Sequence, residues 1–392
     1  MAGCVSLLAC DACQPPNSVD GNGAVYEPSR ACSLSEPVSL ASSNGSGPIE
    51  ATTSGNSLDL LVYGRLTGDA EDLHYLRLGT DLSIQMGPFP LRSEGTGPLY
   101  PEALAVDGNA IAAVGRQEGR RRAYFFTFRD ADDISLVQVP GLSSLDRRVH
   151  VTLIEPRVGA GVQVVTHVTG YNTIGVGRLA GSMLVTRELD LPPLLAVPAT
   201  TNAPQGALVV FTLEQGATSR TTLMFREVAA DASPSRNTVV VEPPSDARVD
   251  SLRVVASGGN YWAFWQLWTE GQATVQGAII DEETFAVTRL DPIVSPTEGG
   301  SILMFQAASY GEGVLVAWTE RDTSTGHLYV REIRDPSAAP VDSLLRSRLS
   351  VEHREIELIN VDDRPLLLWR ETPLGELHGD VLTGWLECSD PQ

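Results

Sequence analysis

The amino-acid sequence predicts an all-β fold, a single seven-bladed β-propeller of four-stranded blades, from three observations. A Trp-x-Glu pattern recurs at residues 268–270, 318–320 and 369–371, which spaces the tryptophans by 50 and 51 residues. Short apolar runs alternate with turns rich in the 36 glycines and 25 prolines, and no long apolar run has helical spacing. The last repeat lacks a fourth strand, while a strand without a repeat stands at the other end of the chain.

Each repeat of about fifty residues reads as four strands, which we label A to D in chain order. Strand B is the most apolar, and strand C alternates between apolar and polar residues. The B strands are predicted to begin near Leu58, Ala110, Gly161, Ala207, Tyr261, Gly313 and Pro365. The C strands are predicted to begin near Asp72, Arg122, Asn172, Thr221, Ala273, Gly326 and Glu376.

The first and last strands of each repeat are weaker in the sequence. Strand A precedes strand B in each repeat, as in residues 102–106 and 252–256. Turn residues follow these strands, as Asp107-Gly108-Asn109 does in the second repeat. Strand D follows strand C after a polar hairpin. The predicted D strands include residues 134–139, 183–189, 238–241 and 285–290.

The two ends of the repeat array are expected to meet. The chain ends soon after Trp385, so the seventh repeat has no D strand of its own. Residues 35–41 form a strand that belongs to no repeat, and we expect it to complete the seventh blade. Closure protects the edges that an open array would expose. Residues 31–392 are therefore assigned to the propeller; six or eight blades, or two sandwiches, are the alternatives, and sandwiches would not explain the even period.

The first thirty residues are predicted to lie outside the propeller. The stretch Leu7-Leu8-Ala9-Cys10 resembles the bacterial lipobox, in which an acylated cysteine becomes the mature N-terminus. The polar run after it resembles the tether of a surface lipoprotein, so residues 1–30 are interpreted as a signal remnant and tether. The nine residues before Cys10 depart from the pattern, because they contain no basic segment.

This resemblance implies an exported protein of a high-GC bacterium, on the outer surface or in the periplasm, with a lipid anchor at Cys10. No other stretch approaches the ~20 apolar residues that span a bilayer, so membrane contact is expected only through that anchor. Among propeller families the likeness is to the architecture alone. The sequence has no Trp-Asp dipeptide with an upstream Gly-His, no kelch double glycine with its spaced aromatics and no sialidase Asp-box.

The cysteines offer two pairings. Cys32 and Cys388 flank the two ends of the repeat array, and a bond between them would fasten the first strand to the last. Closing so long a loop would constrain the unfolded chain by about 5–6 kcal/mol in the chain-entropy description, and it requires an oxidising compartment. Cys13 with Cys32 is the competing pair. Cys10 and Cys13 form a Cys-x-x-Cys pair, but neither a βαβ pattern nor two further zinc ligands accompany it.

The charge and the absence of motifs exclude several classes of function. The formal charge is −21, with 49 acidic and 28 basic residues, so the surface repels phosphate backbones and we expect no nucleic-acid binding. The sequence contains no lysine, which removes Schiff-base and lysine-nucleophile chemistry. No phosphate loop, dinucleotide fingerprint or nucleophile elbow is present. His74, His327 and His378 begin C strands of different blades and need not converge, so neither a metal nor a cofactor is expected.

Two groups of charged residues are the candidate binding residues. Glutamates that close the B strands recur at equivalent positions in five repeats, and in a propeller they would form an acidic crown on one face, able to bind a cation or a basic partner. The alternative is that they are solvated turn residues. Arginines in the second B–C loop would contact an anion, a phosphate or the crown, and the alternative is that they belong to a solvated loop. The candidates are Glu118, Glu214, Glu270, Glu320 and Glu371 in the crown, and Arg116, Arg120, Arg121 and Arg122 in the loop.

The repeated tryptophans invite a carbohydrate-stacking hypothesis. Trp268, Trp318 and Trp369 lie inside apolar strands, however, so we predict that they fill the core between blades.

We expect a monomeric, non-catalytic propeller that binds a protein or glycan partner through one face. The alternative is a carbohydrate-active hydrolase or lyase that uses Glu270, Glu320 and Glu371, which would require paired carboxyl groups about 5–9.5 Å apart. Regular repetition of these glutamates argues against catalysis, which needs asymmetry. A purely structural scaffold is a third interpretation.

Overall fold

The computed structural model describes most of the chain beyond residue 30. The described residues are 31–43, 49–66, 72–92, 98–107, 110–117, 123–137, 149–154, 162–168, 173–180, 183–203, 207–216, 220–229, 233–290, 292–336, 340–376 and 379–389.

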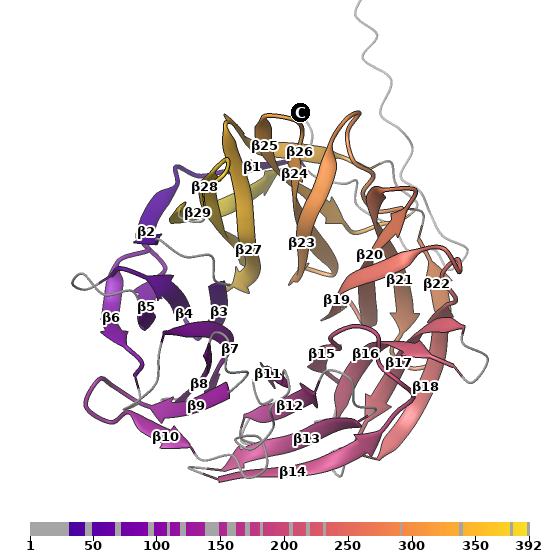
Figure 1. The fold of residues 1–392 in the computed structure, drawn as a ribbon, viewed down its shortest axis with the longest axis horizontal. Helices are drawn as coiled ribbons and strands as arrows, with labels where there is room; N and C mark the ends of the chain where they lie inside the picture. The colour runs from indigo at the N-terminus through magenta and orange to yellow at the C-terminus, as the bar shows by residue number, and fades with distance from the viewer. Residues whose placement is uncertain are drawn as a thin grey trace, which may run out of the picture.

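The described residues form a seven-bladed β-propeller, as the repeat period predicts. Their strands lie in seven antiparallel sheets, and in six of them the strands follow the chain order A, B, C, D from the axis outward. In the seventh sheet the N-terminal strands take the place of strand D. In Figure 1 the sheets stand as blades around one axis, with the A strands innermost. Among the described residues no helix is long and apolar enough to cross a membrane.

The B strands begin within two residues of their predicted positions, whereas the A strands begin earlier than predicted, as in β19, which starts at residue 248 instead of 252. The A strands of blades one to seven are β3 (Ile49–Ser54), β7 (Leu99–Asp107), β11 (Val149–Ile154), β15 (Ala199–Asn202), β19 (Arg248–Ser257), β23 (Ser301–Tyr310) and β27 (Val351–Val361). The B strands are β4 (Ser57–Gly64), β8 (Ala110–Gln117), β12 (Gln163–Val168), β16 (Leu208–Gln215), β20 (Asn260–Thr269), β24 (Gly313–Arg321) and β28 (Arg364–Pro373).

The two outer strands complete each blade. The C strands are β5 (Asp72–Gly79), β9 (Ala123–Phe128), β13 (Thr173–Ala180), β17 (Thr221–Val228), β21 (Gln272–Asp281), β25 (Thr325–Ile333) and β29 (Gly379–Ser389). The D strands of blades one to six are β6 (Ile84–Pro90), β10 (Ser135–Val137), β14 (Met183–Asp190), β18 (Pro234–Val241), β22 (Val287–Arg289) and β26 (Asp342–Leu349).

The N-terminal segment completes the seventh blade, as predicted. Two short strands, β1 (Ala31–Leu34) and β2 (Val38–Ser43), both pair antiparallel with β29, where a single strand over residues 35–41 was expected. Residues 35–37 separate them, because Pro37 has no N–H to donate to the ladder. Ser35 keeps this junction in place, since its N–H donates to the Trp385 carbonyl at 2.9 Å.

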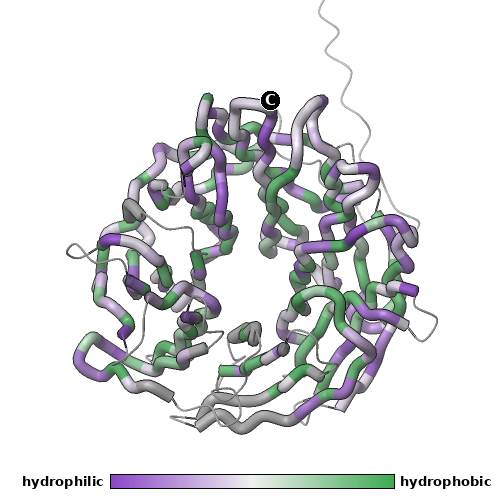
Figure 2. Tube along the Cα trace, viewed as in Figure 1, coloured by the Kyte–Doolittle hydropathy of each residue, from purple (hydrophilic) through white to green (hydrophobic). Residues whose placement is uncertain are grey.

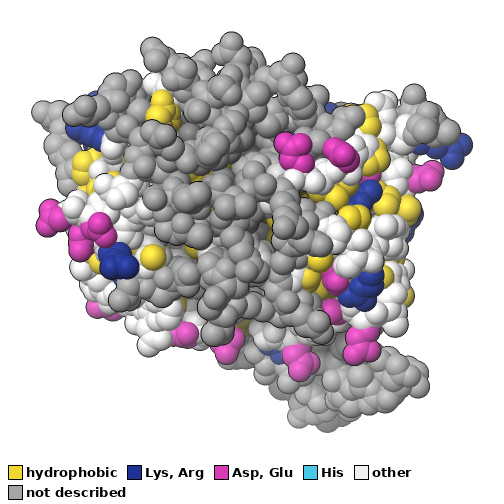
Figure 3. Space-filling view, turned by 90° about the horizontal axis from the view of Figure 1, so that it is seen from below, with side chains coloured by type: hydrophobic (Ala, Val, Ile, Leu, Met, Phe, Trp, Pro, Cys, Tyr) yellow, Lys and Arg dark blue, Asp and Glu magenta, His cyan; other side chains and the backbone are white. Residues whose placement is uncertain are grey.

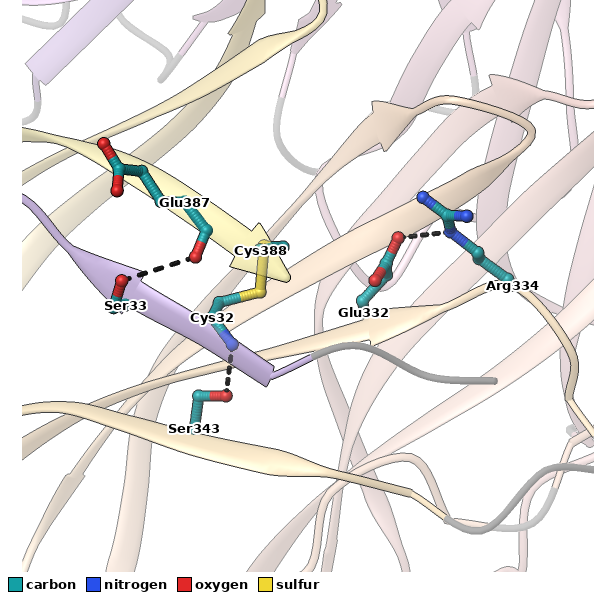
Figure 4. Close-up of a disulfide and its surroundings, with 7 residues drawn as sticks. All are labelled: Cys32, Ser33, Glu332, Arg334, Ser343, Glu387 and Cys388. Carbon is teal, nitrogen blue, oxygen red and sulfur yellow. Dashed lines mark hydrogen bonds and ion pairs between the residues drawn. A yellow bond between two sulfur atoms is a disulfide. The ribbon is translucent and has the colours of Figure 1, made fainter. Parts of the chain in front are cut away.

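The disulfide between Cys32 and Cys388 fastens this closure and confirms the predicted pairing. The two residues face each other in the β1–β29 ladder, 356 residues apart in the chain. Figure 4 shows the bond beside two hydrogen bonds, from Cys32 N–H to Ser343 Oγ at 2.8 Å and from Ser33 Oγ to the Glu387 carbonyl at 3.4 Å. Ser343 belongs to β26, so the closing strand is also fixed to blade six. The bond indicates an oxidising compartment.

The cores lie between neighbouring blades and are built largely from the B and C strands. Figure 2 shows hydrophobic residues along these middle strands. Trp318 of blade six packs with blade five, and Trp369 of blade seven packs with blade six; both are fully buried. The prediction that these two tryptophans are core residues is confirmed.

The third core tryptophan is Trp265 rather than Trp268. The A–B hairpins close at Asn260, Gly313 and Arg364, and Trp265, Trp318 and Trp369 each stand five residues later. Trp265 packs with blade four in the same way, 6.2 Å from the Phe211 ring. Trp268 is only partly buried. The Trp-x-Glu match at residues 268–270 is therefore shifted by three residues, and the expected equivalence of Glu270 with Glu320 and Glu371 is wrong.

Candidate functional site

Glu214 of the predicted crown is held inside blade four by an arginine. Its carboxylate accepts hydrogen bonds from Arg226 Nη2 at 2.8 Å and from Thr212 Oγ1 at 2.5 Å, and Arg226 Nη1 makes a further contact. Only 3% of the Glu214 side chain is exposed. A buried carboxylate paired in this way has its charge balanced within the blade.

Glu320 is satisfied by neutral donors. It accepts hydrogen bonds from Thr297 N–H at 3.1 Å, from Thr297 Oγ1 at 2.7 Å and from Trp318 Nε1 at 2.8 Å. Trp318 stands two residues earlier in β24, and side chains two apart in a strand share one face. Thr212 donates to Glu214 from the same relative position. This shared spacing explains why the glutamates recur at the end of the B strands.

Glu371 combines both kinds of partner. Arg348 Nη1 donates at 2.5 Å, Arg346 Nη2 at 3.3 Å and Trp369 Nε1 at 3.3 Å. Burial alone would raise the pKa of the Glu371 carboxyl, but the hydrogen bonds from Arg346 and Arg348 outweigh it and hold the pKa below its usual range. Glu371 is therefore a carboxylate whose charge is neutralised by arginines of the same protein.

Glu270 is exposed, in contrast. It lies in the two-residue turn between β20 and β21, with a positive φ of 53°. The remaining candidates carry no structural description. Arg116 belongs to β8 but its side chain lies outside the described residues, as do Glu118, Arg120, Arg121, Arg122 and Cys10.

His74 and His327, two of the three histidines predicted to begin C strands, each contact a residue of their own strand or of the adjoining loop. His74 is buried, its Nδ1 lies 3.0 Å from the Asp72 carbonyl oxygen, and burial lowers the pKa of its imidazole. His327 lies 3.4 Å from Asp322, and His378 is outside the described residues. In the part of the chain that is described, no group of three or more histidine, cysteine or acidic side chains is placed to hold a metal ion.

A second group of charged residues lies on the A strands, at the axis. Four of them occupy the same position in their A strands, four residues before the last residue that pairs with strand B at the hairpin. These residues are Glu50, Arg253, Gln306 and Glu357. Glu102 joins this level from the register shift in β7. The A strands are neighbours around the ring and surround its axis in Figure 1. We define the axial cluster as Glu50, Glu102, Arg253, Gln306, Glu355 and Glu357.

A chain of hydrogen bonds joins three neighbouring blades at this level. Arg253 Nε donates to Gln306 Oε1 at 2.6 Å, and Gln306 Nε2 donates to Glu357 Oε2 at 2.7 Å. Glu50 of blade one feels the charges of Glu357, Glu102 and Arg253, which belong to blades seven, two and five. Charged groups of blades seven, two and five therefore act on Glu50 across the axis.

Burial shifts the pKa values of Glu357 and Glu50 in the axial cluster. Burial raises the pKa of Glu357 to about 7, against the attraction of Arg253 and the Gln306 hydrogen bond. Burial also raises the pKa of Glu50 well above its usual value, with repulsion from Glu357 and Glu102 adding to it. These side chains nevertheless remain partly exposed to solvent. Near neutral pH Glu50 and Glu357 therefore still bind protons, and a bound cation could replace these protons.

The excess of acid defines what the axial cluster can hold. Arg253 is the one guanidinium that interacts with both Glu50 and Glu357, and burial lowers its pKa against the attraction of these two carboxylates. At the bulge of β27, Glu355 has a positive φ of 51°, and burial raises its pKa against the attraction of Arg370 and Arg354. A cationic group at the axis would relieve the repulsion between these carboxylates.

Sequence reasoning missed the axial cluster. The sequence contained a signal for it, because polar residues recur in the A strands at about the repeat period, at Arg253, Gln306 and Glu357. A single polar residue in a weakly predicted strand is most simply interpreted as solvent-facing. Only the closure of the ring brings such residues of different blades together.

Comparisons with known proteins establish the fold and no more. No protein-family profile matches the chain, and no curated protein matches its sequence. A protein of unknown function from Dyadobacter fermentans is similar in structure, with a TM-score of 0.53 and 12% identity over 92% of this chain and all of the other.

Two further solved structures show the same architecture. YCF48 bound to a D1 peptide superimposes with a TM-score of 0.52 and 12% identity, over 92% of this chain and 96% of the other. A putative 6-phosphogluconolactonase from Bacteroides uniformis gives a TM-score of 0.51 and 14% identity, over 85% and 95% of the two chains. The similar structures thus include a peptide complex and a putative enzyme, so the fold does not choose between binding and catalysis.

Proposed function

We propose that this chain is an exported, non-catalytic propeller that binds a protein or glycan partner, and that it receives a cationic group of the partner at the axial cluster. The convergence of Glu50, Glu102 and Glu357 around one arginine carries this proposal. The disulfide supports an exported, oxidised protein. A surface anchor would come from acylation of Cys10.

The chemistry of the axial cluster favours an ammonium or guanidinium group. A carboxylate accepts two hydrogen bonds from a guanidinium fork, and such charge-assisted bonds are about twice as strong as neutral ones. Partial burial strengthens the attraction, since the surroundings screen it less than bulk water does. A partner residue such as arginine or lysine is therefore the group that this site suits.

The surface around the ring attracts basic partners without selecting one. The net charge of −21 steers cations toward the protein. Figure 3 shows one side of the ring, where exposed acidic side chains are interspersed with arginines over the described surface. Selectivity is therefore assigned to the axial cluster, where the carboxyl groups converge.

The test is calorimetric binding of an end-blocked arginine pentapeptide, with the matching citrulline pentapeptide as the uncharged control. Wild-type protein should bind the arginine peptide and not the citrulline peptide. Glu357→Gln should weaken binding about tenfold or more, which corresponds to a charge-assisted hydrogen bond. Glu283→Gln, at an exposed position of blade five, is the matched control and should bind normally. Equal affinity in wild type and Glu357→Gln, or no binding at all, refutes the proposal.

One observation favours a second function. Glu50 and Glu357 are neighbouring carboxyl groups with raised pKa values, and glycosidases use such a pair as general acid and as base or nucleophile. A carbohydrate-active enzyme would release nitrophenol from a panel of 4-nitrophenyl glycosides. That activity should disappear in Glu357→Gln and persist in Glu283→Gln. Hydrolysis with this pattern would replace the binding proposal by an enzymatic one.

A further inference from the structure

Gln306 is the uncharged member of the axial cluster. It lies in β23 of blade six, and β23 contacts β19 of blade five and β27 of blade seven. Its Oε1 accepts a hydrogen bond from Arg253 Nε at 2.6 Å, and its Nε2 donates to Glu357 Oε2 at 2.7 Å. One amide group therefore joins the arginine of the cluster to one of its glutamates.

The partners of Gln306 fix the orientation of its amide group. A guanidinium carries N–H donors and no acceptor, so the amide atom that faces Arg253 must be the carbonyl oxygen. Arg253 is itself held in place, because its Nη1 donates to the Leu252 carbonyl at 2.8 Å. The amide nitrogen therefore faces Glu357, since a reversed amide would place two donors against each other at Arg253.

The orientation of the amide determines which oxygen of Glu357 can hold a proton. An amide nitrogen donates hydrogen bonds and does not accept them, so Glu357 Oε2 must be the accepting, unprotonated oxygen. A proton on this carboxyl group therefore lies on Oε1. Among the described residues none donates a hydrogen bond to Oε1, and the Glu357 side chain is partly exposed to solvent. Oε1 is thus the oxygen that remains open to a ligand.

The charge of Glu357 depends on its neighbours and on Gln306. Burial raises the pKa of the Glu357 carboxyl to about 7, while the attraction of Arg253 and the hydrogen bond from Gln306 act in the opposite direction. Repulsion links Glu357 to Glu50 of the neighbouring strand β3. The other charged groups that act on Glu50 are Glu102, Arg253 and Glu355. Without the Gln306 hydrogen bond, Glu357 would hold its proton more tightly.

We propose that Gln306 is a positioning residue of the axial cluster, which keeps Glu357 Oε2 as a hydrogen-bond acceptor and presents Oε1 to the cationic group of the partner. Where Oε1 carries a proton, binding breaks its O–H bond, the proton passes to water, and the ionised oxygen accepts an N–H hydrogen bond from the cation. This inference rests on the proposed function, because the exchange requires a cationic partner at the axis.

The first test compares the pH dependence of peptide binding in wild type and Gln306→Leu. Leucine is similar in size but makes neither hydrogen bond. Loss of a hydrogen bond to a charged group should make Glu357 an about tenfold weaker acid, so the affinity for the arginine pentapeptide should fall about fivefold at pH 7. The loss should nearly disappear at pH 9, where Glu357 is ionised in both proteins. A purely structural change would lower the affinity equally at both pH values.

The second test follows the ionisation of Glu357 directly and needs no ligand. Glutamate labelled with ¹³C at the side-chain carboxyl carbon reports each carboxyl group in an NMR titration. The signal that disappears in Glu357→Gln belongs to Glu357. In Gln306→Leu this signal should titrate at a higher pH than in wild type.

Gln276→Leu is the matched control. Gln276 is a partly exposed glutamine of β21 in blade five, and its Nε2 donates to Thr274 Oγ1 at 2.9 Å. This variant also loses a glutamine hydrogen bond, but on a C strand instead of an A strand at the axis. Its affinity for the pentapeptide and its Glu357 titration should equal those of wild type.

Three results would overturn the assignment: an unchanged Glu357 titration in Gln306→Leu, an equal loss of affinity at pH 7 and pH 9, or the same loss in Gln276→Leu. Failure of the wild-type protein to bind the pentapeptide would instead refute the proposed function, and with it the exchange of a proton for a cation. The titration would still decide whether Gln306 controls the ionisation of Glu357, so the two failures are distinguishable.

Discussion

Glu357 illustrates how a single residue can serve a site at a cost to stability. Its pKa is about 7 in the fold and near 4.3 in an unfolded chain. The folded state therefore keeps a proton that the unfolded state loses, and this contribution to stability is lost as pH rises from about 4.5 to 7.

Glu357→Gln should therefore stabilise the protein at pH 8, by up to about 3 kcal/mol. The gain should disappear below about pH 4.5, where wild-type Glu357 is protonated in both states. Urea unfolding at pH 4.5 and pH 8 measures the difference, with Glu283→Gln as the control. A variant that is less stable than wild type at pH 8 would contradict the assignment. Stabilisation would also show that weaker peptide binding by this variant is not caused by unfolding.

His353 should make the protein sensitive to acid. It is fully buried, 3.7 Å from Glu371, and burial lowers the pKa of its imidazole to about 4 against the attraction of that carboxylate. An unfolded chain binds the proton near pH 6.5, so stability should fall as pH drops from 6.5 to 4, by as much as about 3 kcal/mol.

His353→Gln should flatten this part of the pH profile. The measurement is the free energy of unfolding in urea at half-unit steps between pH 4 and pH 7, and the partly exposed His327→Gln is the comparison. Parallel profiles for wild type and His353→Gln would show that the buried imidazole does not cause the acid sensitivity.

At the scale of the strand, the position of a residue relative to its hairpin matters more than a local motif. Trp265 and Trp268 both lie in β20, but only Trp265 occupies the position of Trp318 and Trp369. Counting from the A–B turn identifies the core tryptophan, because that turn sets the strand register.

Trp265→Ala should destabilise the protein by about 3–5 kcal/mol, the usual loss for a buried aromatic side chain. Trp268→Ala should cost less than half as much, since Trp268 is only partly buried. Guanidinium unfolding followed by circular dichroism measures both. Equal losses would contradict the register assignment.

The end glutamates of the B strands also belong to this scale. Glu214, Glu320 and Glu371 recur because each accepts a hydrogen bond from the side chain two residues earlier, a contact made within one strand. Their repetition marks a shared structural device of the blade, and it explains why a regular motif carries no catalytic asymmetry.

At the scale of the whole molecule, the disulfide holds the first and last strands together. Cys32 and Cys388 are 356 residues apart in the chain, so the bond closes a long loop and lowers the entropy of the unfolded state. It acts together with the β1–β29 ladder and the hydrogen bond to Ser343.

The double variant Cys32→Ser/Cys388→Ser should lose about 5–6 kcal/mol in the chain-entropy description. Reduction of the wild-type protein should lower its urea midpoint to about that of the double variant. Reductant should leave the midpoint of the double variant unchanged. An identical midpoint for oxidised and reduced wild type would show that the β1–β29 pairing alone closes the ring.

The sequence by itself determined the architecture of this protein. The sequence left two pairings open for Cys32, and the structure selects Cys388. A period of about fifty residues, a missing last strand and an unpaired first strand are signals that can be found in the sequence alone, and the structure confirms the seven blades and the shared last blade. These features follow from strand pairing between segments whose hydrophobic pattern already specifies them.

Only the tertiary structure decided which charged residues meet. Glu50 and Arg253 are far apart in the chain and lie on weak strands, yet ring closure places both at the axis. Glu371 looked like a free surface carboxylate, but Arg346 and Arg348 of the neighbouring blade reach it. The physical reason is that side-chain convergence depends on how blades pack against one another, whereas the repeat period records only how each blade pairs its own strands.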